Sequence, residues 1–270
     1  MNYRGWKALD ECLESIAAIV SKKITFEVIV IDNMSNDGQF PLFKEKYSTF
    51  TLTENSGNNG FSNGCNFGAS MATGNHFLFL NPDTKLTIEA LETLIQTSIS
   101  HPEIGILSCL QINENDKFYN QNNLFPALGR FLGISRAIYR KINSSKLEKR
   151  FTAKGDLFYP DWVTGAVVCI SKGWFAKING WNEDYWLYFE DVDLCKKITA
   201  VGGKVAVTRK ATIFHQHGGA SRLNIKTKAI TKTEVIISKH TYISNQFPIG
   251  IQFYLHSLLV IGVLFEKTVL

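Results

Sequence analysis

Short apolar runs alternate with longer helical patterns along this chain, and this alternation constrains the fold more than any other feature. The strand candidates are FEVIVID (26–32), HFLFLNPD (76–83), IGILSCL (104–110) and WVTGAVVCI (162–170). The helical patterns cover residues 39–47, 61–73, 87–100 and 171–178. Strands that alternate with helices of this length predict an α/β fold, with a mostly parallel central sheet flanked by helices. The sequence has no internal repeat and no Gly/Ser linker, which favours one domain.

The composition is that of an ordinary globular protein. Of the 270 residues, 45% are hydrophobic and 20% are charged, which is enough apolar material for one large α/β domain. The formal charge of +5 is mild for this length, and we expect no nucleic-acid partner. The five cysteines are widely spaced without a CxxC pair, so we expect reduced core residues of a cytosolic protein.

Two of the strand candidates end in a carboxylate. Asp32 closes the first apolar run, and Asp83 follows the run from Phe77 to Leu80. In sheets of this kind, ligands collect beyond the carboxyl ends of the strands. Between these two runs lies the loop NSGNNGFSNGCNFG (55–68), whose glycines and asparagines permit left-handed backbone and the close approach of a ligand. Such a loop either binds phosphate at the following helix N-terminus or is an ordinary set of turns.

The order of several motifs carries a resemblance to a known family. The motifs are NYRGW, VIVIDNMSNDG, NSGNNGFSNGCNFG, FLFLNPDTKL, WVTGAVVCISKGWFAKINGWNEDYWLYFEDVDLCKKI and FHQHGGAS. In their order and approximate spacing they resemble family 2 glycosyltransferases with the GT-A fold, and among these the rhamnosyltransferase-like branch. The resemblance covers nearly the whole chain, from about residue 2 to about residue 240.

The resemblance implies an inverting enzyme that moves a sugar from a nucleoside-diphosphate sugar to an acceptor hydroxyl, with Mg²⁺ or Mn²⁺ as cofactor. Asn81-Pro82-Asp83 occupies the place of the family's DXD motif, so Asp83 would be the metal carboxylate. One acid is sufficient, because these cations take further oxygen ligands from phosphate and water. His215 would complete the metal shell because it directly follows the apolar run ATIF, with His217 in reserve. A simple Asx turn after the proline is the alternative for Asp83.

The same resemblance implies where the nucleotide and the donor bind. Asp32 resembles the acid that meets the base or ribose, and Asn2 and Tyr3 match the stretch that closes over the base. The expected donor-binding set is Asn2, Tyr3, Asp32, Asn33, Ser35, Asp37, Asn59, Gly60, Asn66 and Asn81. For Asp32 the alternative is a strand-end acid that caps the next turn.

The segment YFEDVDLCKKI (188–198) has three carboxylates at the beginning of a helix. Acids in a first helical turn are commonly there for the macrodipole. By resemblance to the family's Glu-Asp pair, Asp191 is the base that accepts the proton of the acceptor hydroxyl, and Glu190 orients the acceptor. Asp193 is expected to cap the helix. The segment expected to line the donor-sugar and acceptor pocket contains Trp162, Gly165 and Ala166, and a core position is the alternative for the tryptophan.

Two regions bear on the partners of the chain. Residues 128–158 form a basic insertion, in which Phe, Leu and Ile are interleaved with Arg130, Arg136, Arg140, Lys141, Lys146, Lys149, Arg150 and Lys154. This pattern suits a membrane surface or a lipid-linked acceptor, and a solvated helical insertion is the alternative. Residues 249–265 carry no formal charge but are slightly short for a spanning helix, so we expect an interfacial or packed helix.

The expected organisation is a GT-A glycosyltransferase domain over residues 1–245 and an apolar C-terminal helix over residues 246–270. The N-terminus runs directly into an amphipathic helix pattern, without a signal-peptide pattern. We expect a cytoplasmic enzyme, peripheral at the inner face of the plasma membrane. Its glycan or lipid-linked acceptor would belong to bacterial cell-surface polysaccharide, such as O-antigen, capsule or exopolysaccharide.

One departure from the family concerns the first strand. Family members begin with an apolar strand just before the NY of NYRGW, in the middle of the sheet, and here that strand is missing. We therefore expect either a natural start upstream of Met1 or a truncated, inactive nucleotide-sugar-binding protein. A nucleotidyltransferase is a further alternative, but it would need an N-terminal signature such as GxGxR, and the sequence has none.

Overall fold

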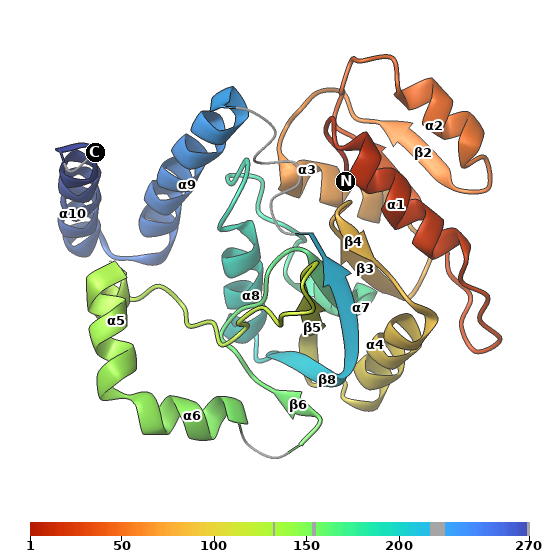
Figure 1. The fold of residues 1–270 in the computed structure, drawn as a ribbon. Coiled ribbons are helices and arrows are strands. Elements are labelled where there is room, and N and C mark those ends of the chain that lie inside the picture. The colour runs from red at the N-terminus through yellow and green to blue at the C-terminus, as the bar shows by residue number, and fades with distance from the viewer. Residues whose placement is uncertain (132, 153–154, 217–224, 269–270) are drawn as a thin grey trace.

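The computed structural model describes all of residues 1–270 except 132, 153–154, 217–224 and 269–270 (Figure 1). The strands are β1 (Ile29–Asp32), β2 (Thr51–Glu54), β3 (His76–Leu80), β4 (Thr84–Lys85), β5 (Ile104–Ile112), β6 (Leu157–Phe158), β7 (Val167–Ser171) and β8 (Lys204–His215). The helices are α1 (Trp6–Ala17), α2 (Phe40–Lys46), α3 (Phe61–Met71), α4 (Ile88–Ser100), a 3-10 turn η1 (Leu128–Arg130), α5 (Gly133–Ile142), α6 (Ser144–Thr152), α7 (Lys172–Lys177), α8 (Glu190–Ala200), α9 (Ile225–Gln246) and α10 (Ile249–Thr268).

The expected α/β class, with a central sheet flanked by helices, is confirmed, but the sheet is mixed. Its main path runs β3-β7-β5-β8-β4, and β6 pairs with β8. Strands β5 and β8 are parallel, whereas β7 is antiparallel to both β3 and β5, and β4 is antiparallel to β8. The long segment between β5 and β7 lets the chain return in the opposite direction, which a run of short βα repeats would not allow.

Strand β1 pairs with β2 in a separate parallel sheet of two strands. On its other side, β1 meets the backbone of Asn2, whose N–H donates to the Ile31 carbonyl at 2.7 Å. The Asn2 carbonyl accepts from the N–H of Asn33 at 2.8 Å. This backbone bridge extends the small sheet beyond β1 by one residue.

The helices cover the two faces of the larger sheet. Along β7 the side chains alternate, with Val167 and Cys169 in a cluster that includes α1 and α4 residues. Val168 and Ile170 belong to a second cluster, which includes residues of α3 and α8. Because both faces are buried, the strand reads as a continuous apolar run, as the sequence predicts.

The predicted helices match α2, α3, α4 and α7 within a few residues. The four strand candidates contain or overlap β1, β3, β5 and β7. The sequence pattern marked only the end of β8, the apolar run ATIF before His215, because Arg209 and Lys210 interrupt the apolar alternation. All five cysteines are free and buried, as expected, and burial raises the pKa of the Cys65, Cys109 and Cys169 thiols to about 12.

Helices α9 and α10 form a hairpin at one side of the molecule, close to α5 (Figure 1). The inner side of the hairpin buries Tyr242, Ile243 and Leu255 against Phe131 and Val192. The charge-free stretch expected at the C-terminus is therefore a helix that packs one of its faces. Within the described ranges, none of the helices combines the length and apolar character needed to cross a bilayer.

Gly60 joins two parts of the fold that are far apart in sequence. Its φ is +94°, and an added Cβ would lie 2.5 Å from the Trp186 carbonyl oxygen. The Trp186 carbonyl also accepts from the N–H of Phe61 at 2.8 Å, at the first turn of α3. The glycine predicted to approach a ligand thus lies against the chain that precedes α8.

We predict that Gly60→Ala lowers the free energy of unfolding by about 2–4 kcal/mol, through the positive φ and the clash with Trp186 together. Gly38→Ala is the matched control, because Gly38 also has a positive φ, of +76°, but open space around its Cβ position. The control should lose only about 1–2 kcal/mol. Urea unfolding measures both, and equal losses would show that the close approach to Trp186 has no energetic weight.

Candidate active site

The antiparallel pairing of β4 with β8 brings Asp83 and His215 together. Thr84 pairs with His215 in register, and the N–H of Gln216 donates to the Asp83 carbonyl at 2.8 Å. The Asp83 Oδ1 atom lies 3.4 Å from His215 Nε2. The Asp83 side chain is only 11% exposed, so this strand end is more enclosed than the sequence indicated.

The Asp83–His215 pair fits a divalent cation. Asp83 Oδ1 is buried and accepts no hydrogen bond from the described residues, although a carboxylate oxygen away from water normally needs a donor or a cation. The facing imidazole nitrogen is a ligand type that Mn²⁺ accepts, and carboxylate is the type that both Mg²⁺ and Mn²⁺ prefer. The described residues contain no cluster of three or more His, Cys, Asp or Glu side chains, so phosphate and water oxygens would complete the shell.

Glu190 and Asp191 begin α8, and the backbone that presents them is strained. Tyr188 and Phe189 both have positive φ values, of +69° and +66°, which non-glycine residues adopt rarely. The Asp191 carboxylate accepts from the backbone N–H of Gly165 at 3.1 Å and from that of Val192 at 2.8 Å. The pair therefore lies against the segment that leads into β7.

Glu190 and Asp191 differ in how strongly their surroundings raise the pKa of the carboxyl group. Burial, reinforced by the neighbouring Asp191 carboxylate, raises the pKa of Glu190 well above its usual range, and Glu190 Oε2 has no hydrogen-bond partner among the described residues. Burial also raises the pKa of Asp191, to about 6, although the backbone N–H of Gly165 counteracts it. At neutral pH this arrangement favours a protonated Glu190 beside an ionised Asp191.

Asp193 does not cap α8 as the sequence suggested, because that helix has no side-chain cap. The Asp193 carboxylate is buried and accepts from the Gln246 side chain of α9 at 3.0 Å. It lies in the first turn, where the macrodipole favours an acid. Its contact is therefore with the helical hairpin.

The loop after β1 is held by Asp32. Its carboxylate is fully buried and accepts from the Asn2 side chain at 2.8 Å, and from the N–H and the hydroxyl of Ser35 at 2.8 and 2.7 Å. These contacts correspond to the alternative reading, an acid that caps the next turn. Contact between Asp32 and a nucleotide stays a prediction.

A chain of asparagine side chains continues from this loop into α3. The Asn33 amide donates to the Gly60 carbonyl, and its oxygen accepts from Asn55. Asn55 also donates to Asn63, and both Asn63 and Asn66 donate to Glu183 at 2.7 Å. The network joins the predicted donor loops to the segment that carries Glu190.

The remaining residues predicted to bind the donor or the metal do not gather in one place. Asp37 accepts from the Trp6 indole at 2.8 Å, Tyr3 is 38% exposed, and Asn59 is exposed. The Asn81 N–H donates to the Ala166 carbonyl at 3.0 Å, which brings the predicted metal loop against the predicted sugar pocket. Residue His217, the reserve metal ligand, lies outside the described residues.

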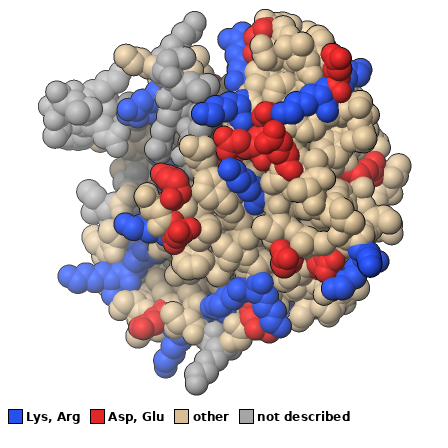
Figure 2. Space-filling view, turned by 45° about the vertical axis from the view of Figure 1, so that its right-hand side comes forward, with Lys and Arg blue, Asp and Glu red and all other residues tan. Residues whose placement is uncertain are grey.

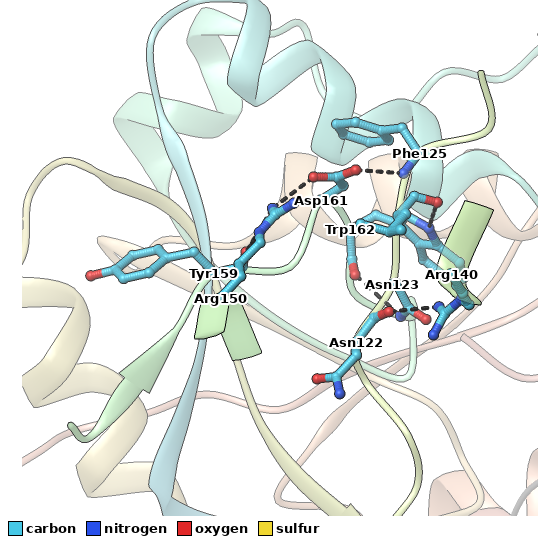
Figure 3. A network of polar contacts seen from close by, with 9 residues as sticks. Asn122, Asn123, Phe125, Arg140, Arg150, Tyr159, Asp161 and Trp162 are labelled. Carbon is cyan, nitrogen blue, oxygen red and sulfur yellow. Dashed lines mark hydrogen bonds and ion pairs between the residues drawn. The ribbon is translucent and has the colours of Figure 1, made fainter. Parts of the chain in front are cut away.

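Trp162 and the basic insertion make structural contacts (Figure 3). The Trp162 indole donates to the Leu124 carbonyl at 3.2 Å, and the ring packs with two core clusters. Arg150 pairs with Asp161 at 2.7 Å, and Arg140 donates to the Asn122 carbonyl. Two of the predicted basic residues thus tie the insertion to the segments on either side of it. Figure 2 shows acidic and basic side chains interspersed over the face it presents.

Sequence reasoning missed two residues that connect the site. Glu183 belongs to no recognised motif, and an acidic residue in a loop is ordinarily expected to be exposed to solvent. Gln111 ends an apolar strand and is 2% exposed, and a polar residue at a buried strand position is a signal that could have found it. It contacts His215 and Thr164.

Two family models match parts of this chain. The model described as "Glycosyl transferase family 2" matches residues 1–166, and the model described as "N-terminal domain of galactosyltransferase" matches residues 149–218. The chain is 28% identical over 132 residues to rhamnosyltransferase WbbL of Escherichia coli, an alignment that covers 48% of each protein. It is 21% identical over 239 residues to an N-acetylglucosaminyl-diphospho-decaprenol L-rhamnosyltransferase of Mycobacterium tuberculosis, covering 80% of this chain and 74% of the relative.

Solved structures support the fold at low identity. A GalNAc-T7 structure with UDP, GalNAc and Mn²⁺ has a TM-score of 0.60 at 15% identity, covering 93% of this chain and 52% of that one. A mannosyltransferase from Pyrobaculum calidifontis, in complex with GDP-Man and Mn²⁺, has a TM-score of 0.60 at 14% identity, covering 96% and 66%. The chain thus spans about half the length of WbbL and of GalNAc-T7. With the family model matching more than half of its residues, the chain belongs to glycosyl transferase family 2.

Proposed function

We propose that this chain is an inverting glycosyltransferase that moves a sugar, rhamnose by preference, from a nucleoside diphosphate to an acceptor hydroxyl. The observation that carries this proposal is that the loop with Asp83 and the Asp191 carboxylate both contact the same short segment before β7. Asn81 bonds to Ala166, and Asp191 accepts from Gly165. A donor diphosphate and an acceptor hydroxyl held at these two pairs would therefore be neighbours.

Asp83 and His215 would hold Mg²⁺ or Mn²⁺. When bound, the cation would neutralise the charge that builds up on the leaving diphosphate. The contribution of the protein is to keep the Asp83 carboxylate enclosed and aimed at the imidazole. Since the site offers one carboxylate, cation affinity should depend strongly on the diphosphate.

Asp191 would be the base and Glu190 a neutral hydrogen-bond donor to the acceptor. A base works best when its pKa is close to the working pH, and burial raises the pKa of Asp191 to about 6. The protonated Glu190 carboxyl can donate to an oxygen of the acceptor without placing a second charge beside Asp191. Two neighbouring carboxyls thus take different roles because their surroundings differ.

The names of the relatives support the choice of substrate. The mycobacterial relative is named for rhamnosyl transfer to N-acetylglucosaminyl-diphospho-decaprenol, and the Escherichia coli relative is also named a rhamnosyltransferase. We extend this to a glycan or lipid-linked acceptor in bacterial cell-surface polysaccharide synthesis. An inactive nucleotide-sugar-binding protein is the second candidate, favoured by the separate pairing of β1 and β2. Donor binding without release of nucleoside diphosphate would support it.

We also propose that the enzyme is cytoplasmic and peripheral at a membrane surface. The outward face of α10 exposes Ile249, Phe253, Tyr254, Val260 and Ile261, and α5 exposes Ile138 and Ile142. These two helices lie at the same side of the molecule (Figure 1). Exposed Arg136 and Lys141 on α5 would add attraction to anionic lipid headgroups.

We predict that Asp83→Ala loses the Mn²⁺-dependent increase in melting temperature with UDP, or with whichever nucleoside diphosphate stabilises the parent most. The fold should persist, because the change removes a buried carboxylate oxygen that has no hydrogen-bond donor. Differential scanning fluorimetry with and without Mn²⁺ measures this. Asp156→Ala is the control and should keep the Mn²⁺ response, because its exposed carboxylate pairs with Lys210. An unchanged Mn²⁺ response in Asp83→Ala would remove Asp83 from the site.

We predict that Asp191→Asn keeps donor binding but lowers transfer by about 10²–10⁴-fold, because the amide cannot accept the acceptor's proton. Transfer by the parent enzyme should fall as pH drops below about 6, where Asp191 is protonated. Glu190→Gln mimics the protonated carboxyl and should cost less, mainly in acceptor affinity. Nucleoside diphosphate release and calorimetric donor binding separate the effects. A dead Glu190→Gln beside an active Asp191→Asn would reverse the two roles.

We predict that Phe253→Ser reduces binding to anionic phosphatidylglycerol vesicles by about three- to tenfold, since the side chain is 78% exposed on α10. Phe118→Ser is the matched control, because Phe118 is also largely exposed, at 63%, but belongs to a bridge beside β5. Vesicle co-sedimentation measures both. Equal binding by the two variants would exclude α10 as the membrane contact.

A further inference from the structure

Gln111 has a buried side-chain amide that contacts both His215 and the segment before β7. It lies near the end of β5, is 2% exposed, and makes two side-chain hydrogen bonds. Its Oε1 atom is 2.9 Å from His215 Nδ1, and its Nε2 donates to the Thr164 hydroxyl at 3.3 Å. The remainder of β5 before it is almost entirely apolar, with the sequence IGILSCL.

The bond to His215 determines where the imidazole carries its proton. An amide oxygen can only accept, so His215 Nδ1 must be the donor. In the neutral ring, Nε2 then has a lone pair, and this nitrogen is the one that lies 3.4 Å from Asp83 Oδ1. The amide lies with Nε2 towards the Thr164 hydroxyl and with Oε1 towards His215.

The second bond reaches the carboxylate pair. Thr164 is followed by Gly165, whose N–H donates to Asp191 at 3.1 Å. The Gln111 side chain thus contacts His215 on one side. On the other side it contacts Thr164, whose neighbour Gly165 donates to Asp191. The arrangement links the two pairs without any charged group between them.

We propose that Gln111 is a positioning residue that fixes the Nδ1–H tautomer of His215 for cation binding and ties it to the Thr164–Gly165 segment that contacts Asp191. This inference rests on the proposed function, because it assumes a cation at Asp83 and His215. Partners that hold the second nitrogen of a metal-binding imidazole commonly change metal affinity by about 10–100-fold when removed.

An apolar residue would be the ordinary choice at this position. Leucine would fill a similar volume in a strand that is otherwise almost entirely apolar, so the buried amide is accounted for by its two hydrogen-bond partners, His215 and Thr164. Gln121 provides a matched control. It is also buried, at 6% exposed, and its amide donates to the Cys109 carbonyl of the same strand, but it has no bond to His215.

The first experiment measures Mn²⁺ binding by electron paramagnetic resonance in the presence of a fixed, saturating concentration of UDP, because the diphosphate supplies further oxygen ligands to the cation. We expect Gln111→Leu to raise the Mn²⁺ dissociation constant about 10–100-fold. Gln111→Glu retains an acceptor for Nδ1–H and should stay within about threefold of the parent. Gln121→Leu should bind as the parent does. Parent-like binding by Gln111→Leu, or an equal loss in Gln121→Leu, would overturn the proposal.

The second experiment reads the imidazole directly and needs no metal. Nitrogen-15 NMR of the metal-free parent should show a proton on His215 Nδ1, assigned by the loss of the signal in His215→Ala. The Nε2–H form should gain population in Gln111→Leu. A parent in the Nε2–H form would overturn the proposal.

The proposed function can fail separately from this inference. If Asp83→Ala and His215→Ala bind Mn²⁺ as the parent does, the cation site itself is wrong, whereas the NMR result still tests the bond from Gln111. If both variants lose Mn²⁺ while Gln111→Leu retains it, only the role of Gln111 is wrong.

Discussion

The register between β5 and β8 determines where the site residues meet. Cys109 pairs with Thr208, but the next residue, Leu110, pairs with Thr212, so β8 accommodates extra residues opposite one step of β5. The Arg209 guanidinium holds this irregular segment by donating to the carbonyls of Gly155, Leu157 and Phe151. A register shift of one residue would turn side chains to the opposite face of the sheet. The bulge therefore sets which β8 side chains lie beside the end of β5.

The elements with strong local patterns could be predicted from the sequence. The N-cap hydroxyl of Thr87 and the apolar face of α4 are local signals, and so are the continuous apolar runs of β3 and β7. Strand direction and the bulge in β8 depend on pairing between distant segments, which no local pattern encodes. Likewise the carboxylates at strand and helix ends were identifiable, and so was the turn that Asp32 caps. The contacts of Asp32 with Asn2 and of Asp193 with Gln246 were not, because they join residues 30 or more positions apart.

The carboxylate pair depends on support from the helical hairpin. Two consecutive non-glycine residues at positive φ cost about 1–3 kcal/mol each, so the surrounding packing must hold them. The Ser238 hydroxyl of α9 donates to the Leu187 carbonyl, and the Phe189 ring packs against Tyr242. Buried Tyr185 and Val192 complete this cluster. Helices α9 and α10 thus support the geometry of Glu190 and Asp191.

The buried cysteines have a practical consequence for labelling chemistry. Each of the five is shielded from solvent, and burial holds the pKa of the Cys195 thiol, like those of Cys65, Cys109 and Cys169, far above neutral pH. Maleimide reagents react with the thiolate, so these side chains should be slow to react while the protein is folded. A single cysteine introduced on an exposed loop would then be the preferred attachment point for a fluorophore. Distances between such probes could be followed without first replacing the native thiols.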